Sequence, residues 1–215
     1  RKTVRPFAGR PMIGWPIATA LESGLFDAVV VSTDDEEIAR AATASGALCP
    51  FRRPPALADD VTPLRPVIRH AVAAWEEAAG RRAGLVCSLL ATAALVTPEE
   101  LREGHARLAD PEVAFAFSAE RFPAPVQRAF TIGADGGLAM REPEHRFTRS
   151  QDLPTCYFDA GQFYWGRRDA WLSDEPMYGP RARAVVLPPG RVVDIDNPED
   201  WDQAERIFAL RRGGA

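Results

Sequence analysis

Short apolar runs alternate with helical patterns along the first half of the chain, and this alternation limits the fold more than any other feature. The β-branched run "DAVVVST" (27–33) precedes "DDEEIARAATASG" (34–46), which has acidic residues in its first turn and a glycine at its end. The run "AGLVCSLLAT" (83–92) lies between helical patterns at 64–80 and 97–110. Continuous apolar runs are typical of buried parallel strands. Their alternation with helices predicts an α/β fold, with a mostly parallel sheet covered by helices on both faces.

Glycine, proline and capping residues predict where these elements begin and end. Gly24 is a plausible stop for a helix within 11–26, and "ALCPF" (47–51) reads as a brief strand. The proline-rich stretch "RRPPALADDVTP" (52–63) must be a loop. Thr97 is the expected N-cap of the helix at 97–110, because proline follows it and glutamate stands at the capping-box position.

The second half of the chain is richer in strands. We expect a hairpin at 127–140 that turns on Asp135, Gly136 and Gly137. The stretch 141–158 is polar and has no clear period. At 215 residues the chain is most simply a single domain, 1–215. The remaining strands are predicted at 113–120, 159–166, 181–188 and 191–195, with a closing helix at 198–212.

Composition excludes several classes of protein. No apolar run approaches the roughly 18–20 residues that span a bilayer, and no secretory signal pattern is found. A net charge of −4 argues against a nucleic-acid partner. Three cysteines, far apart and odd in number, predict reduced thiols in a cytoplasmic protein and neither a disulfide frame nor a zinc site.

Two aspartates stand one residue apart in "RVVDIDNPEDW" (191–201). Residues two apart in a strand point to the same face, so Asp194 and Asp196 can direct both carboxylates to one point. Such a pair suits Mg²⁺, which binds one or two carboxylates together with substrate phosphates. The alternative is that Asp196 caps the helix at 198 and Asp194 is solvated.

Two further stretches carry candidate ligand-binding side chains. In "TRSQDL" (148–153), Arg149 can hold a carboxylate or phosphate bidentately and Gln151 can bind hydroxyls, although such loops are usually only solvated. In "DAGQFYWG" (159–166), alternation puts Gln162 and Tyr164 on one face of the strand. A glutamine among aromatic residues needs a partner or a ligand, and a satisfied core glutamine is the alternative.

Arg53 and Thr62 lie in the proline-stiffened loop 52–63, where little entropy is lost when a ligand binds. A plain surface connection is the alternative. Lys2 is the only lysine among 26 basic residues, so it is a candidate for a role that needs a compact point charge. An exposed position at a frayed terminus is the alternative.

The order and spacing of these stretches resemble the cytidylyltransferases that activate nine-carbon acidic sugars. This is the family of CMP-sialic acid synthetase, and the resemblance is closest to its pseudaminic acid branch. It covers nearly the whole chain. The stretches that carry it are "RKTVRPFAGRPMIGWPIATALESGLFDAVVVSTDDEEIA", "RRPPALADDVTP", "TRSQDL", "YFDAGQFYWG" and "RVVDIDNPEDW", and the third and fourth together are the specific part.

The resemblance implies a Rossmann-like, GT-A-like nucleotidyltransferase fold with a small dimerisation and sugar-binding insertion at about 113–166. It implies that CTP and a nonulosonic acid, pseudaminic acid above all, give the CMP-sugar and pyrophosphate in a homodimeric enzyme. Asp194 and Asp196 would hold Mg²⁺ or Mn²⁺, with Lys2 beside them in catalysis. Arg149, Gln151, Gln162 and Tyr164 would bind the sugar, and Lys2, Asp34, Arg53 and Thr62 the nucleotide.

Members of this family open with a strand and a phosphate loop of the Ala-Arg-Gly-Gly-Ser-Lys type. Neither precedes Arg1, so we expect both in residues upstream of it. Two other functions stay open at this point. One is another sugar nucleotidyltransferase, of the CMP-Kdo or NDP-hexose type. The other is a non-catalytic module that binds a nucleotide or dimerises.

Overall fold

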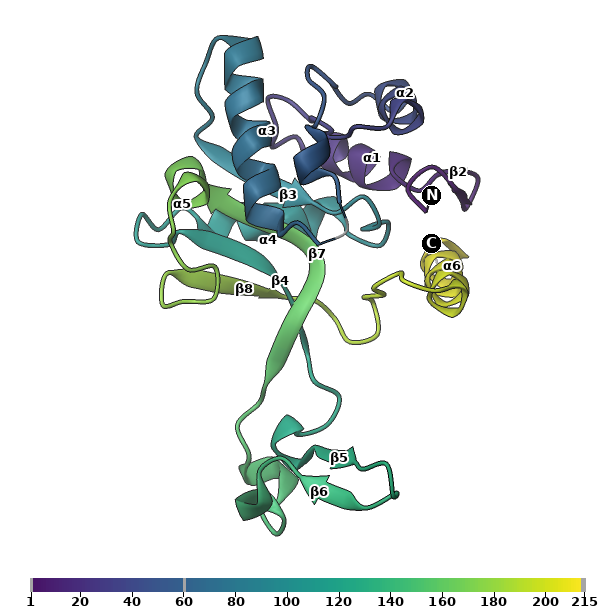
Figure 1. Cartoon of the computed structure of the whole chain (residues 1–215), viewed down its shortest axis with the longest axis vertical. Helices are drawn as coiled ribbons and strands as arrows, with labels where there is room; N and C mark the ends of the chain where they lie inside the picture. Colours follow the sequence, from purple (N-terminus) through teal and green to yellow (C-terminus); the bar gives the residue numbers. More distant parts are fainter. Residues whose placement is uncertain (1, 60, 214–215) are drawn as a thin grey trace.

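A four-stranded sheet with the strand order β3-β7-β4-β8 forms the centre of the protein (Figure 1). The computed structural model describes residues 2–59 and 61–213. β7 is antiparallel to both of its neighbours, and β4 is parallel to β8. β3, β4 and β8 therefore run in the same direction. Their carboxyl ends lie at the same end of the sheet, which is called here the carboxyl edge. The strands are β3 (Leu85–Leu89), β4 (Phe115–Arg121), β7 (Tyr157–Arg167) and β8 (Ala182–Val186).

Helices cover both faces of this sheet, as the sequence predicted. Leu101 of α4 (Pro98–Arg107) packs in one cluster with Phe163 and Trp165 of β7. On the other face, α3 (Leu64–Ala79) and the short α5 (Arg168–Leu172) pack against Phe115. The predicted capping box of α4 is present, since the Thr97 hydroxyl and the Glu100 carboxylate accept each other's backbone N–H.

The two ends of the chain pack against each other. A small hairpin of β1 (Pro6–Phe7) and β2 (Arg10–Pro11) leads into α1 (Gly14–Ser23), and α6 (Pro198–Gly213) lies beside it (Figure 1). The ring centroids of Phe7 and Trp201 are 5.4 Å apart, and those of Trp15 and Phe208 are 4.5 Å apart. The sequence did not predict this hairpin, whose strands have only two residues each.

The predicted strands at 27–33 and 47–51 are reduced to one parallel bridge between Val30 and Leu48. Val31 N donates to Leu48 O at 2.9 Å, and Leu48 N donates to Val29 O at 2.8 Å. The two segments flank α2 (Glu36–Ala44) and run side by side there. They form no longer ladder within the described residues, which is why neither becomes a regular strand.

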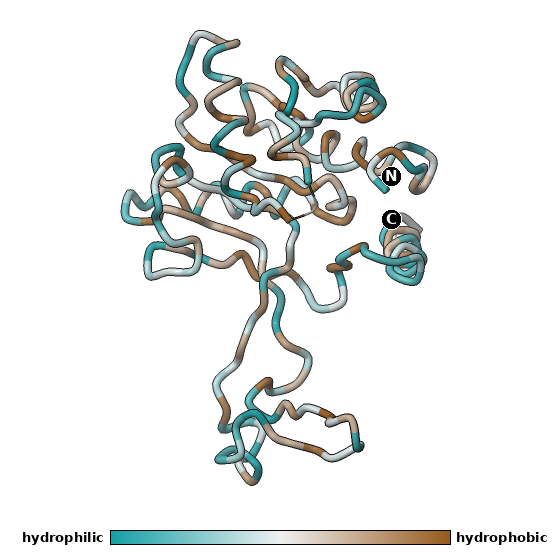
Figure 2. Tube along the Cα trace, in the orientation of Figure 1, coloured by the Kyte–Doolittle hydropathy of each residue, from teal (hydrophilic) through white to brown (hydrophobic). Residues whose placement is uncertain are grey.

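Residues 122–156 form a lobe that projects from the sheet at the end of the β4–β7 ribbon (Figure 1). Its regular part is the hairpin of β5 (Phe130–Ile132) and β6 (Leu138–Met140), close to the predicted one. Short 3₁₀ turns, among them Ser150–Asp152, complete it. Figure 2 shows hydrophobic residues interspersed with strongly hydrophilic ones throughout this lobe. No helix in the described part of the chain has the length and apolar character needed to cross a membrane.

Candidate functional site

Asp194 and Asp196 project from the same side of the segment that follows β8. Both are exposed, whereas Val193 and Ile195 are buried in the cluster formed with α6. This alternation puts the two carboxylates on one face, in agreement with the sequence pattern. The predicted strand at 191–195 is wrong, however, because the segment pairs with no other strand among the described residues. Packing of the two apolar side chains produces the alternation without a ladder.

Lys2 brings the beginning of the chain to this pair of carboxylates. Its Nζ donates to Asp196 Oδ1 over 3.2 Å and to the backbone carbonyl of Ile195. The side chains of Lys2 and Asp196 are 47% and 72% exposed, so a ligand can reach both. We call Lys2, Asp196 and the neighbouring exposed Asp194 the mixed-charge centre, in which the ammonium contacts Asp196.

The start of α6 holds the aspartate segment in place. Asp200 Oδ2 accepts from the backbone N–H groups of Asp196, at 2.9 Å, and Asn197, at 3.1 Å. Asn197 Oδ1 accepts from Asp200 N at 2.9 Å in return. These bonds hold the pKa of the Asp200 carboxyl below its ordinary value, and the backbone hydrogen bond from Asp196 has the largest effect. Asp196 is therefore not the cap of this helix, and its carboxylate is left for Lys2.

Two buried polar atoms without a hydrogen-bond partner lie where the segments 27–33 and 52–63 meet. They are Ser32 Oγ and Arg53 Nε. The backbones are joined here by a bond from Arg53 N to Thr33 O at 3.0 Å. Leaving a buried donor unpaired costs about 1–3 kcal/mol, so such atoms are uncommon in native proteins. The unpaired Arg53 Nε is what an arginine with a missing ligand would show.

Thr62 and Asp34, also predicted for this side, differ in what they offer. The Thr62 hydroxyl and backbone N–H both donate to Asp59 Oδ1, each over 2.6 Å. The hydroxyl bond, followed by the backbone bond, lowers the pKa of Asp59. Thr62 therefore shapes the loop before α3. Asp34 is exposed, next to Asp35, whose carboxylate caps α2.

Gln162 is a core residue and does not share a face with Tyr164. It is 4% exposed, and its Nε2 donates to the carbonyls of Ala160, at 2.9 Å, and Gly161, at 3.2 Å. The cause is a bulge, in which the register between β4 and β7 shifts and Ser118 Oγ accepts from two successive N–H groups of β7. Period two fails across a bulge, so the prediction of a shared face is wrong. The alternative, a buried glutamine whose amide is hydrogen-bonded within the core, describes Gln162 correctly.

Asp159 and Tyr178 are site candidates that sequence reasoning missed. Asp159 Oδ2 accepts from the hydroxyls of Tyr164, at 2.7 Å, and Tyr178, at 2.6 Å. Burial is the main cause that raises the pKa of Tyr164, followed by the hydrogen bond to the Asp159 carboxylate. The negative charge of Asp194 raises it further. Because β7 is antiparallel, Asp159 near its start lies at the carboxyl edge. The available signal was an aspartate two residues before the bulge glycine, Gly161, which has a φ of 60° and donates its N–H to Asp159 Oδ1.

Arg149 and Gln151 lie together, but on the projecting lobe. With the Gln151 amide oxygen facing the guanidinium, Arg149 Nε donates to it over 3.1 Å. Both residues are exposed. Figure 1 shows the lobe well separated from the start of α6, where Asp196 lies. Within one chain, the structure does not bring these two residues to the aspartate pair.

The main body therefore offers two exposed carboxylates with an ammonium beside Asp196, and, on the separate loop 52–63, an unpaired guanidinium nitrogen. Hard carboxylate oxygens are the ligands that Mg²⁺ prefers, and a cation there would commonly share them with phosphate oxygens. Ammonium and guanidinium groups bind phosphates well. A site of this composition suits phosphoryl-type transfer, in which the protein contributes mainly positioning and charge.

Comparison with known proteins points to the same chemistry. The cytidylyltransferase family matches residues 1–211. A pseudaminic acid cytidylyltransferase from Campylobacter jejuni is 36% identical over 215 residues, which are 100% of this chain and 92% of that protein. A CMP-N,N'-diacetyllegionaminic acid synthase from the same species is 28% identical over 98% of this chain and 89% of its own.

A solved structure of CMP:2-keto-3-deoxy-manno-octonic acid synthetase complexed with CTP has the same fold. It superposes with a TM-score of 0.68 over 98% of this chain and 92% of its own, at 16% sequence identity. At this identity the likeness concerns the fold alone.

Proposed function

The chain belongs to the cytidylyltransferase family, and from this premise we propose that it converts CTP and a nonulosonic acid, most specifically pseudaminic acid, to the CMP-sugar and pyrophosphate. The observation that carries the proposal is the 36% identity, over the whole chain, to a pseudaminic acid cytidylyltransferase. The mixed-charge centre of Lys2, Asp194 and Asp196 supports it, since a triphosphate needs both cationic contacts and metal ligands.

Asp194 and Asp196 are proposed to hold Mg²⁺ or Mn²⁺. The fit rests on two exposed carboxylates on one face, fixed by the buried Val193 and Ile195 and by the cap of α6. When bound, the cation would offset the negative charge that the triphosphate and the leaving pyrophosphate carry. Lys2 anchors Asp196 and adds one positive charge beside this position.

The remaining residues of the main body orient the reactants. Arg53 is proposed to satisfy its unpaired Nε on the nucleotide, with Thr62 and Asp59 holding the loop that carries it. Asp159 fixes the hydroxyls of Tyr164 and Tyr178 and so sets the shape of the site near Asp194. Held in this way, the sugar's anomeric hydroxyl attacks the α-phosphate in line and pyrophosphate leaves.

We further propose that the enzyme works as a homodimer in which the lobe of one copy completes the site of the other. Arg149 and Gln151 lie away from Asp196 in their own chain (Figure 1). The lobe also exposes several large apolar side chains, as a surface that meets a second copy would. They are Phe130, Ile132, Leu138 and Phe147, which are 54–83% exposed. An arginine fork on such a lobe suits the sugar carboxylate.

The reaction is proposed for the cytoplasm, and the three cysteines, all free thiols, are consistent with a reducing compartment. The decisive experiment follows pyrophosphate release from CTP with pseudaminic acid, N-acetylneuraminic acid and Kdo in turn. We expect the highest kcat/KM with pseudaminic acid, because fixed polar groups strongly penalise unpaired substituents. A clear preference for Kdo would favour the CMP-Kdo type. No turnover with any sugar, despite CTP binding, would favour a non-catalytic module.

A further inference from the structure

A pocket lies at the end of the sheet opposite the carboxyl edge, apart from the candidate functional site. It lies where β3, β4 and β8 begin and β7 ends, since Leu85 pairs with Arg167 and Phe115 pairs with both Gly166 and Ala182. Its volume is about 650 Å³, within the range of roughly 300–1,000 Å³ that small-molecule sites occupy. Small residues leave this space open, namely Ala83, Gly84, Ala114 and Ala170.

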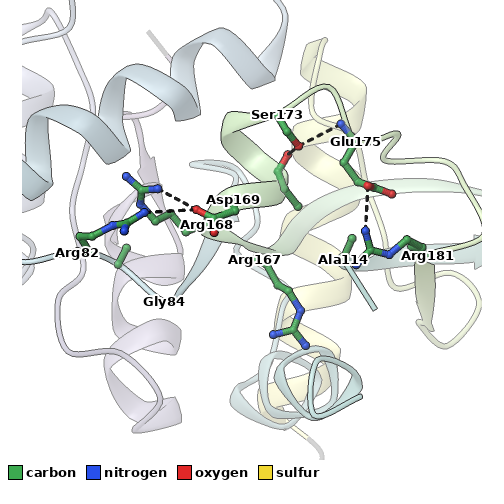
Figure 3. A pocket seen from close by; sticks show the side chains of 11 residues that line it. Arg82, Gly84, Ala114, Arg167, Arg168, Asp169, Ser173, Glu175 and Arg181 are labelled. Atoms are coloured by element: carbon green, nitrogen blue, oxygen red, sulfur yellow. Dashed lines mark hydrogen bonds and ion pairs between the residues drawn. The ribbon is translucent and has the colours of Figure 1, made fainter. Parts of the chain in front are cut away.

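Charged side chains stand on two opposite walls of this pocket. Figure 3 shows Arg82, Arg168 and Asp169 on one side, and Glu175 and Arg181 on the other. Arg181 pairs with Glu175 over 3.0 Å. Arg168 is held by Asp169, at 2.8 Å, and by Glu76, which binds it through both oxygens at 2.6 and 2.8 Å.

The positive charge of the pocket is not fully balanced. Arg167 donates only to the backbone carbonyls of Leu108, Asp110 and Val113, and it has no carboxylate partner among the described residues. Arg82 has a single carboxylate partner among the described residues, Asp169, at a distance of 3.6 Å. The four lining arginines therefore face three carboxylates, those of Glu76, Asp169 and Glu175, which leaves one net positive charge in a chain whose overall charge is −4.

Arg82 and Arg181 are the groups best placed to meet a ligand. Their side chains are 72% and 44% exposed, and they come from opposite walls of the pocket. A guanidinium fork fits an oxyanion bidentately, so two forks across an open space can hold one small anionic molecule. Neither residue belongs to the proposed catalytic site.

We propose that this pocket is a second binding site, for a small organic molecule that carries a phosphate or carboxylate group. Two sources share this chemistry, nucleoside phosphates and acidic sugars. The pocket is large enough for either. Because it lies at the end of the sheet away from the aspartate pair, a molecule bound there leaves the catalytic site free.

Residue-resolved NMR of the full chain can test this. The probes are CMP for the nucleoside phosphates, glucuronate for the acidic sugars, and inorganic phosphate as the minimal oxyanion. The amides of Gly84 and Ala114 report on the pocket, and those of Arg53 and Thr62 report on the catalytic site. We expect saturable shifts of the pocket amides with at least one probe. CMP alone would identify a nucleotide site and glucuronate alone a sugar-acid site.

Three variants make the test specific. Arg82→Gln and Arg181→Gln each remove one fork, and we expect the affinity of the pocket to fall about tenfold, the scale of one charged hydrogen bond. Gly84→Leu fills the space without touching an arginine, and a Cβ added at Gly84 meets no atom within 4 Å. The matched control is Arg81→Gln, because Arg81 pairs outside the pocket with Asp27 and lies over the Trp75 ring.

The proposal stands if Arg81→Gln binds like wild type while the three pocket variants bind more weakly. It fails if the pocket amides do not shift with any probe at a concentration of about 10 mM, because a dissociation constant above that scale is too weak for a specific site. It also fails if the shifts persist unchanged in Gly84→Leu and Arg82→Gln, because the anion would then be bound elsewhere.

Discussion

Lys2 Nζ lies 3.2 Å from Asp196 Oδ1, although 194 positions separate the two residues in the sequence. The contact depends on the aromatic cluster between the first residues and α6, in which Phe7 meets both Trp201 and Phe208. Folding of the two ends against each other therefore assembles the charged centre of the proposed catalytic site.

The aspartate pair gives the first prediction. Asp194→Ala and Asp196→Ala should each lower kcat by at least about 10²-fold, the scale of losing one stabiliser of transition-state charge. The measurement is steady-state pyrophosphate release from CTP over a range of Mg²⁺ concentrations. Glu199→Gln is the control, since Glu199 is exposed and adjacent but lies in the first turn of α6. Near-wild-type turnover in either alanine variant would remove the metal role.

Arg149→Lys should raise the KM for the sugar about tenfold, or about 1.4 kcal/mol, and leave CTP binding little changed. A lysine keeps the charge but cannot form the planar fork that matches a carboxylate. Arg146→Lys is the matched control on the same lobe, because Arg146 lies over the ring of Phe147. If calorimetry shows weaker CTP binding and an unchanged sugar KM, Arg149 belongs on the phosphate side.

Mixing two inactive variants should restore activity if the lobe acts on the partner copy. In a heterodimer of Asp196→Ala and Arg149→Ala, one of the two sites would combine an intact body with an intact lobe. Random exchange at equal concentrations should then recover about a quarter of wild-type activity. A site built within one chain predicts no recovery, since every site would carry one lesion. The readout is activity after subunit exchange, with each variant alone as the baseline.

The ion pair between Glu76 and Arg168 predicts a pH-dependent contribution to stability. The hydrogen bond from Arg168 lowers the pKa of Glu76 from 4.5 to about 2, against the opposing effect of burial. A carboxyl group whose pKa is lower in the folded state than in the unfolded state stabilises the fold at pH values above the unfolded-state pKa. For Glu76 this stabilisation is lost as the pH falls from about 4.5 toward 2.

Glu76→Gln should therefore be less stable than wild type at pH 7, by about 1.5 kcal/mol. The difference should shrink between pH 4.5 and pH 2. Urea unfolding at pH 7, 5 and 3 measures it, with Glu77→Gln, an exposed neighbour, as the control. A difference that does not change with pH would mean that packing, not charge, holds Glu76.

Gly104→Ala should destabilise the protein, although alanine is the better helix former by about 1 kcal/mol. A Cβ at this position of α4 would lie 2.6 Å from Trp165 Cδ1 and 2.9 Å from Phe163 Cε2. Overpacking of a core costs about 1–3 kcal/mol, which outweighs the propensity. Thermal unfolding checks the sign. Gly84→Ala serves as the control, because its added Cβ meets open space.

Local patterns were sufficient for most of the fold. The capping box at Thr97 and the long periodic helices formed as predicted, because they depend on residues within a few positions of one another. The segment 27–33 shows the limit of such patterns. Its β-branched residues favour an extended chain, but a strand also needs a partner, and Val30 has a single bridge to Leu48.

The candidate site was predictable in part for the same reason. Alternation correctly placed Asp194 and Asp196 on one side, yet it misplaced Gln162, because the shift opposite Ser118 interrupts the period of two. The position of Arg149 could not be predicted either. Its neighbours in sequence define a turn, whereas the direction of the β4–β7 ribbon, set by long-range packing, decides where that turn lies.

The lobe leaves and re-enters the sheet at Arg121 and Tyr157, which are paired neighbours on adjacent antiparallel strands. Topologically it is thus an enlarged hairpin loop, and the sheet would close the same way around a turn of a few residues. Loop-closure entropy grows only slowly with length, by about 0.6 kcal/mol for each doubling. The segment that carries Arg149 could therefore be lengthened, shortened or exchanged without a new register for the strands that form the carboxyl edge.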